Sequence, residues 1–173
     1  SGLDPHALDW SLHWSASAGI DPWVAEPLPW GTAPLRPVEG GLPAPLAARA
    51  RVLVDPVVLR VPESVDARTV LRGQVAVIAQ QPSGRLVNAS GIQPAWALDD
   101  LYADAAKARL GVTFADGVPT LRVWAPTALA AELLLWLPGR PAGAAPEHVA
   151  LTREADGCWC ATGEASWLGA RYL

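Results

Sequence analysis

Apolar and polar residues alternate near the start of the chain: between residues 7 and 14, Leu and Trp take every second position, and Asp, Ser and His lie between them. A period of two places the two sets on opposite faces of a strand, so this stretch predicts a half-buried β-strand. Residues 21–41 are rich in Pro and Gly and carry Trp23 and Trp30, which predicts an irregular loop pinned to a surface by its tryptophans. A short helix is predicted over residues 44–50.

Two β-branched runs follow, over residues 57–61 and 74–80, and both predict strands. The segment between them, residues 65–71, predicts one or two helical turns. Residues 82–84, Pro-Ser-Gly, predict the turn of a hairpin whose second strand covers residues 85–87. This half of the chain is therefore expected to be a small β domain.

A domain boundary is predicted near residues 91–94, which places a first domain at residues 1–96 and a second at residues 97–173. The second domain opens with Asp99 and Asp100, whose carboxylates are expected to cap a short helix or turn. After it, short strands punctuated by Gly and Pro are typical of a sandwich. These predicted strands cover residues 112–114, 119–124, 131–137, 148–152 and 158–162.

The predicted fold class is all-β with short helices, as two small sandwich-like domains. The second is expected to be an immunoglobulin-like sandwich that lacks its last strands, because the chain ends at Leu173 inside an apparent further strand. Ser1 in place of an initiator methionine indicates an excised piece. A chain that ends within a strand is expected to lack further ladder partners and to expose an apolar edge, which predicts a marginal or aggregation-prone molecule. With an apolar share of 51%, the chain has ample material for packed cores.

The charge pattern argues against two classes of partner. A net charge of -4 without a run of Lys or Arg gives no footprint for nucleic acid or an anionic membrane. No stretch approaches the roughly 18 apolar residues that span a membrane. The sequence leaves the cellular compartment open.

Candidate catalytic and metal-binding residues are few. His6, His13 and His148 are widely separated and near no serine motif, so they are assigned no role. Cys158 and Cys160 fall on one face of a strand, about 6.6 to 6.8 Å apart, which favours structural thiols over a disulfide. We predict no catalytic residue, no metal site and no cofactor, since a Gly-rich phosphate loop is missing as well.

Nine tryptophans are an unusual load for this length, and an indole face can stack on the apolar face of a sugar ring. Filling a core or an interface is the competing interpretation. Strand parity places Trp124 on the face of Arg122, and Trp136 on the face of Glu132. If these polar faces lie outside, Trp124 and Trp136 are the candidates for an exposed, carbohydrate-binding aromatic patch.

Residues 117–128, GVPTLRVWAPTA, closely resemble the opening strand of the β-sandwich that precedes the catalytic barrel in pullulanases and limit dextrinases. That sandwich is similar to a family 48 carbohydrate-binding module. Residues 105–109 and 129–130 depart from the pattern, whereas residues 1–39 match it loosely. The other matching segments are residues 41–43, 60–62, 71–75, 91–93, 98–102, 110–114 and 167–172.

The resemblance implies a parent glycoside hydrolase that cleaves α-1,6 linkages in pullulan, starch or glycogen-derived dextrins with carboxylates of its barrel. That barrel would begin beyond Leu173, so no catalytic residue is carried over to this chain. We expect a non-catalytic accessory region that packs against the barrel and supports it. An autonomous α-glucan-binding module and an unrelated β-sandwich interaction domain are the two alternatives. The family, rather than any signal in the chain, points to a secreted or cell-envelope protein.

Overall fold

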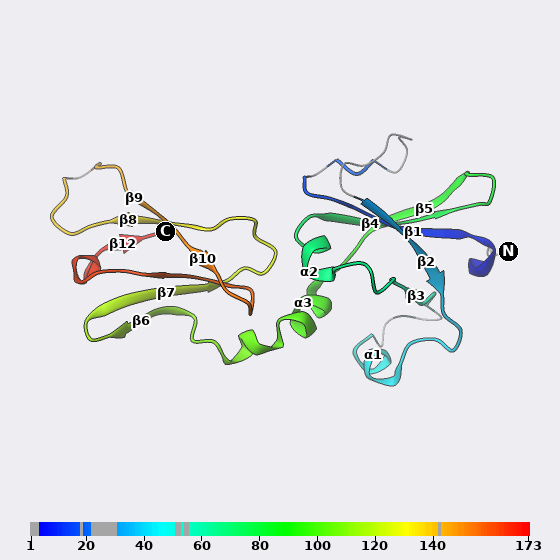
Figure 1. Cartoon of the computed structure of the whole chain (residues 1–173), viewed down its shortest axis with the longest axis horizontal. Coiled ribbons are helices and arrows are strands. Elements are labelled where there is room, and N and C mark those ends of the chain that lie inside the picture. Colours follow the sequence, from blue (N-terminus) through cyan, green and yellow to red (C-terminus); the bar gives the residue numbers. More distant parts are fainter. Residues whose placement is uncertain (1–3, 18, 22–30, 51–52, 54–55, 142) are drawn as a thin grey trace. The chain divides into compact units, whose positions relative to one another are not determined.

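The chain divides into two compact units, Ser1–Gln93 and Pro94–Leu173 (Figure 1). The computed structural model describes residues 4–17, 19–21, 31–50, 53, 56–141 and 143–173. Trp23 and Trp30, the predicted loop anchors, lie outside these residues. Each unit is built on antiparallel strands with short helices, which confirms the predicted all-β class.

The first unit holds a five-stranded sheet in the order β3-β2-β1-β4-β5. The predicted strands over residues 7–14 and 74–80 and the predicted helix over residues 44–50 are confirmed. The strands are β1 (Asp9–Ser15), β2 (Gly31–Pro37), β3 (Leu59–Arg60), β4 (Gln74–Gln80) and β5 (Leu86–Gly91), and the helices are η1 (Pro5–Ala7), α1 (Ala44–Arg49) and α2 (Ala67–Val70).

The core of the first unit lies on the face of the sheet that carries Trp10, Leu12 and Trp14. Leu12 and Val75 are buried there together with Val70 of α2, so the helix covers the apolar set that the alternation had predicted. Burial of apolar side chains on both sides of β4 explains why its sequence is a continuous apolar run rather than an alternating one.

Three boundaries in this unit differ from the sequence prediction. The loop predicted over residues 21–41 is wrong at Gly31–Pro37, because these residues form β2. The strand predicted at residues 57–61 pairs only over Leu59–Arg60. The second hairpin strand extends over Leu86–Gly91, beyond the predicted residues 85–87, since its pairing with β4 continues past a bulge.

The second unit contains two antiparallel sheets, one of four strands in the order β10-β11-β7-β6 and one of three in the order β12-β8-β9. Leu133 and Leu135 of the three-stranded sheet share a buried cluster with Trp159 and Ala161 of the four-stranded one, as in a sandwich. Its elements are α3 (Ala95–Leu101), η2 (Ala103–Lys107), β6 (Gly111–Ala115), β7 (Val118–Trp124), β8 (Glu132–Trp136), β9 (Glu147–Ala150), β10 (Thr152–Arg153), β11 (Cys158–Thr162), η3 (Ala165–Trp167) and β12 (Arg171–Tyr172).

Two details of the second unit correct the sequence prediction. Asp99 and Asp100 lie inside α3 rather than before it, and the N-cap residue is Pro94, which makes no side-chain capping bond, so the predicted capping role is wrong. The single strand predicted over residues 148–152 is broken at Leu151. There the buried Leu151 donates its N–H to Ala131 at 2.9 Å as the chain passes from β9 in one sheet to β10 in the other.

Candidate functional site

Trp124 ends β7 on the outer face of the four-stranded sheet, where the α3–η2 segment covers it. The indole is half-buried and forms one wall of a hollow of about 350 Å³, here called the Trp124 hollow. Asp99, Tyr102 and Leu110 contribute to the other walls. The Nε1 atom of Trp124 is buried and has no hydrogen-bond partner among the described residues. A ligand in this hollow would therefore meet the indole by its ring face rather than by its N–H.

Tyr102 fixes the α3–η2 segment to the sandwich. Its side chain is 3% exposed, and its hydroxyl accepts a hydrogen bond from Arg153 Nη2 at 3.0 Å. The same guanidinium donates to the carbonyl of Pro126 at 2.8 Å and lies 5.9 Å from the centre of the Tyr102 ring. Tyr102 is therefore held by its own burial and by two contacts with Arg153, 51 positions further along the chain: a hydrogen bond and a cation–π contact.

Trp136 ends β8 on the three-stranded sheet and is also half-buried. It lines a polar hollow of about 270 Å³, here called the Trp136 hollow, formed with residues 137–141, 143 and 144 after β8 and with Gly169 and Arg171 at the start of β12. Arg171 of β12 lies directly opposite Trp136 in the strand register. Arg140 of the loop lines the same hollow and forms an ion pair with Glu147. This arrangement combines an aromatic wall with two guanidinium groups.

The structure does not bring the two predicted tryptophans together in one patch. Trp124 belongs to the four-stranded sheet and Trp136 to the three-stranded one, and the side chains that they contact are different. Their predicted contact with carbohydrate stays a prediction. The two arginines near Trp136 were missed by the sequence reasoning, because Arg171 is brought opposite Trp136 only by the pairing of β12 with β8.

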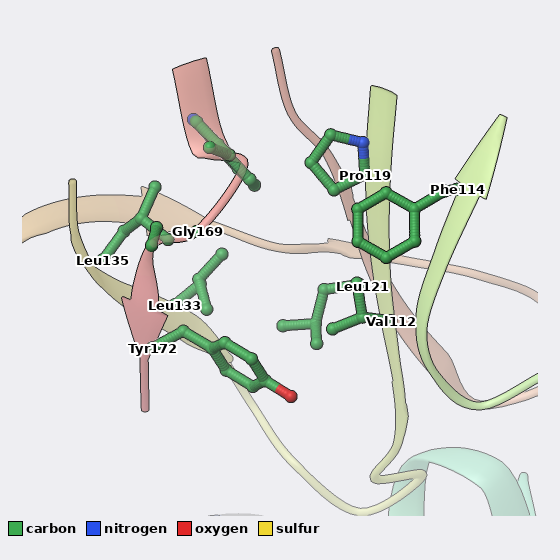
Figure 2. Close-up of a pocket in the computed structure, with 10 residues that line it drawn as sticks. Val112, Phe114, Pro119, Leu121, Leu133, Leu135, Gly169 and Tyr172 are labelled. Atoms are coloured by element: carbon green, nitrogen blue, oxygen red, sulfur yellow. The ribbon is translucent and has the colours of Figure 1, made fainter. Parts of the chain in front are cut away.

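A third hollow, of about 250 Å³, lies between the edges of the two sheets and is mostly apolar. We call it the β6–β12 hollow. Figure 2 shows side chains of the two sheets pointing into the same space. At its rim Phe114 and Tyr172 are 62% and 54% exposed. Its lining residues are Val112, Phe114, Pro119, Leu121, Leu133, Leu135, Trp167, Gly169, Ala170 and Tyr172.

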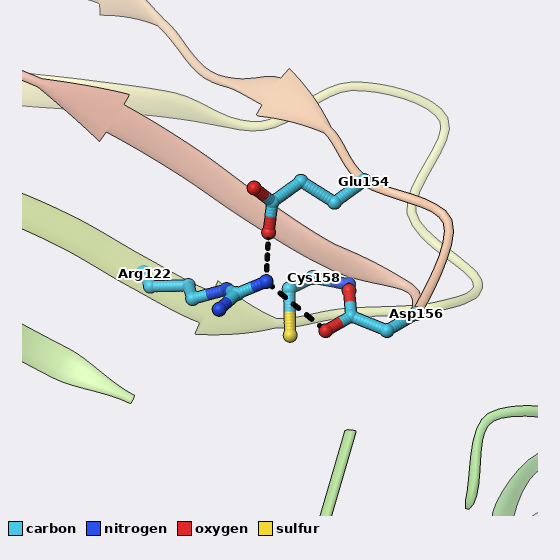
Figure 3. Close-up of polar contacts among 4 residues, drawn as sticks. All are labelled: Arg122, Glu154, Asp156 and Cys158. Atoms are coloured by element: carbon cyan, nitrogen blue, oxygen red, sulfur yellow. Dashed lines mark hydrogen bonds and ion pairs between the residues drawn. The ribbon is translucent and has the colours of Figure 1, made fainter. Parts of the chain in front are cut away.

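A charged cluster holds the β10–β11 turn to β7 (Figure 3). Arg122 Nη2 donates to Glu154 and to Asp156, the latter at 3.1 Å. Asp156 in turn accepts a hydrogen bond from the backbone N–H of Cys158 at 3.0 Å. Sequence parity had placed Arg122 on the outer face, but its partners lie more than 30 residues away and were not anticipated.

The electrostatics of this cluster favour a structural role. Hydrogen bonding by the backbone N–H of Cys158 lowers the pKa of Asp156, with a further contribution from the positive charge of Arg122. Burial, followed by the hydrogen bond and charge of Asp156, raises the pKa of the Cys158 thiol. A thiol held neutral is a poor nucleophile and a poor metal ligand. Cys158 and Cys160 are both free cysteines, as expected for structural thiols.

Two of the three histidines each lie close to one polar side chain. His13 Nε2 lies 2.9 Å from Ser11 Oγ, and His148 Nδ1 lies 3.0 Å from Glu132 Oε2. Within the described ranges, no group of three or more His, Cys, Asp or Glu side chains could hold a metal ion. In the same part of the chain, no helix is long and apolar enough to cross a membrane. The hollows are therefore the more informative features.

Comparison with known proteins gives consistent matches. The family described as the pullulanase N2 domain matches residues 3–100. Pullulanase 1, chloroplastic, of Arabidopsis thaliana is 30% identical over 134 residues, which cover 78% of this chain and 14% of the relative. Pullulanase of Klebsiella pneumoniae is 35% identical over 116 residues, or 65% of this chain and 10% of the relative. The chain thus spans a small part of the length of these relatives.

Solved structures agree over nearly the whole chain. Klebsiella pneumoniae pullulanase complexed with maltotriose superposes with a TM-score of 0.81 at 28% identity, covering 95% of this chain and 15% of that protein. PulA from Klebsiella oxytoca gives a TM-score of 0.80 at 27% identity, again over 95% of this chain and 15% of that protein. Both units of the present structure are included in matches of this extent.

Proposed function

This chain belongs to the pullulanase N2 domain family, a non-catalytic region of pullulanase-type proteins, and from that premise we propose that it packs against and supports a catalytic barrel. The barrel would be that of an α-1,6-glucan debranching hydrolase, the activity that the names of its relatives indicate. The second unit would act as a β-sandwich of the family 48 carbohydrate-binding type.

The β6–β12 hollow carries this proposal. Soluble monomers rarely expose a large contiguous apolar patch, and such patches commonly mark contact surfaces. Here Leu133 and Leu135, which are among the most buried residues of the unit, also line an open hollow with Phe114 and Tyr172 exposed at its rim. An apolar surface of the parent protein that filled the hollow would remove these rings from water.

The experiment is a binding measurement between this chain and the separately expressed catalytic region of the parent protein. We expect a complex that Phe114→Ser weakens by roughly tenfold or more, since burying one large apolar side chain is worth about 1.5–3 kcal/mol. Val123→Ser is the control, because Val123 is 43% exposed in the same unit and does not line the hollow. Failure to bind, or equal effects of the two substitutions, would refute the proposal.

A second candidate function, α-glucan binding by the chain itself, is favoured by the Trp136 hollow. An indole wall offers stacking to a pyranose ring, and guanidinium groups donate hydrogen bonds to ring hydroxyls. Trp124 is the weaker candidate, because its N–H is buried and its hollow is mostly apolar. A related protein, Klebsiella pneumoniae pullulanase, has been solved in complex with maltotriose.

Affinity electrophoresis in gels that contain amylopectin or pullulan tests this second function. Retarded migration that Trp136→Ala abolishes would support it. Trp96→Ala is the matched control, because Trp96 is 45% exposed in α3 and lines neither tryptophan hollow. Unretarded migration of the unaltered chain would leave the supporting role as the function of the molecule.

A further inference from the structure

The Trp136 hollow carries more positive charge than a neutral sugar requires. Arg140 lines it and is paired with Glu147, whereas the exposed side chain of Arg171 forms no hydrogen bond or ion pair with the described residues. Two guanidinium groups against one carboxylate leave one positive charge beside an indole ring. A ligand that carries an anionic group would pair with that charge, whereas a neutral ligand would leave it to the solvent.

The position of Arg171 is set by the sheet. Arg171 and Trp136 are a cross-strand pair of β12 and β8, so their side chains leave the same face of the sheet next to each other. Gly169, with φ of 77°, lines the hollow just before β12 and contributes no side chain that would fill it. The aromatic ring and the guanidinium are therefore held side by side by backbone pairing rather than by a flexible loop.

We propose that the Trp136 hollow binds an α-glucan unit that carries a phosphate ester. The apolar face of the sugar would stack on Trp136, and the phosphate oxygens would accept hydrogen bonds from Arg171 and Arg140. Guanidinium groups match phosphate geometry and bind it with charge-assisted hydrogen bonds, which are the stronger class. At about 270 Å³ the hollow suits one substituted sugar rather than a long segment of chain.

This inference rests on the α-glucan binding proposed above for Trp136, and the test separates the two. The whole chain is run in affinity gels that contain a phosphate-rich amylopectin or the same polymer after phosphatase treatment. We expect the apparent affinity for the phosphorylated polymer to be on the order of tenfold higher, the size of one charge-assisted contact. The preference should shrink as salt is raised, because the contact is ionic.

Three variants complete the test. Arg171→Gln should abolish the preference while retaining binding to the dephosphorylated polymer, and Trp136→Ala should abolish binding to both. Arg36→Gln controls for the lost charge, since Arg36 is exposed in β2 of the other unit. Equal retardation by both polymers, unchanged in Arg171→Gln, would overturn the phosphate inference and leave glucan binding intact. Retardation by neither polymer would defeat both.

Competition identifies the group that is recognised. Glucose 6-phosphate is expected to release the chain from the phosphorylated polymer at concentrations at which inorganic phosphate does not, because only the ester presents a ring to Trp136. Equal release by the two competitors would show that the hollow recognises phosphate alone, which would overturn the ring-stacking half of the inference.

Discussion

Among the described glycines, Gly73 is the one at which an added Cβ atom would come closest to another part of the backbone. It precedes β4, where the chain leaves α2 and pairs with β1. A Cβ atom at Gly73 would lie 2.0 Å from the carbonyl oxygen of Ser15 and 2.9 Å from its carbonyl carbon. Ser15 is itself 2% exposed and pairs with Gln74 at the end of β1, so it has little room to move. Gly73→Ala must therefore separate the two strands locally.

The expected cost is at least that of overpacking a core, about 1–3 kcal/mol. For a unit of this size each kcal/mol lowers the melting temperature by roughly 4–8 °C. Gly91→Ala is the matched control. Gly91 lies in β5, which pairs with the edge of β4 opposite β1, and a Cβ atom there would have no neighbouring atom closer than 4.0 Å. Circular dichroism melts of the two variants provide the assay. If Gly73→Ala melted within a degree of Gly91→Ala, the close approach inferred for Ser15 would be wrong.

Three further predictions follow from single side chains. Burial lowers the pKa of His13 below its ordinary 6.5. As the pH drops below 6.5, the unfolded chain therefore binds a proton at His13 before the folded chain does, and the free energy of unfolding should fall. Urea titrations at several pH values should show a smaller fall for His13→Gln. Iodoacetamide at neutral pH should label Cys160 and spare Cys158, which is 0% exposed and has a raised pKa, and fragment mass spectrometry would locate the label. Tyr102→Phe should cost about 0.5–1.5 kcal/mol in urea unfolding, because Arg153 loses its hydroxyl acceptor, and an unchanged midpoint would contradict that role.

The local pattern of apolar and polar residues was sufficient to predict the two long paired strands of the first unit, β1 and β4. The alternation at β1 and the continuous apolar run at β4 were both recognisable. The prolines of β2 concealed that strand. Pro34 is tolerated because, among the residues that the structure describes, β3 pairs only with Arg36 and Pro37, so no described strand lies outside Pro34 to need its N–H.

The candidate sites could not be predicted to the same extent, because they depend on contacts between distant segments. Trp124 and Trp136 share a parity argument, yet one is covered by the α3–η2 segment and the other faces two arginines. The surroundings of Trp124 depend on the contact between Tyr102 and Arg153. The surroundings of Trp136 depend on the pairing of β12 with β8. A single sequence carries no signal for either of these pairs.

The two proposed functions can occupy one small sandwich because they use different side chains. The β6–β12 hollow is lined by apolar residues of the inner faces, whereas the Trp136 hollow is lined by a loop and by residues at the ends of β8 and β12. Of the residues that line them, Gly169 alone belongs to both, and it has no side chain to engage either occupant. Phe114→Ser should therefore weaken association with a barrel without changing glucan retention, and Trp136→Ala should do the reverse. A substitution at Gly169, where φ is 77°, would strain the backbone beside both hollows and could not separate the two functions.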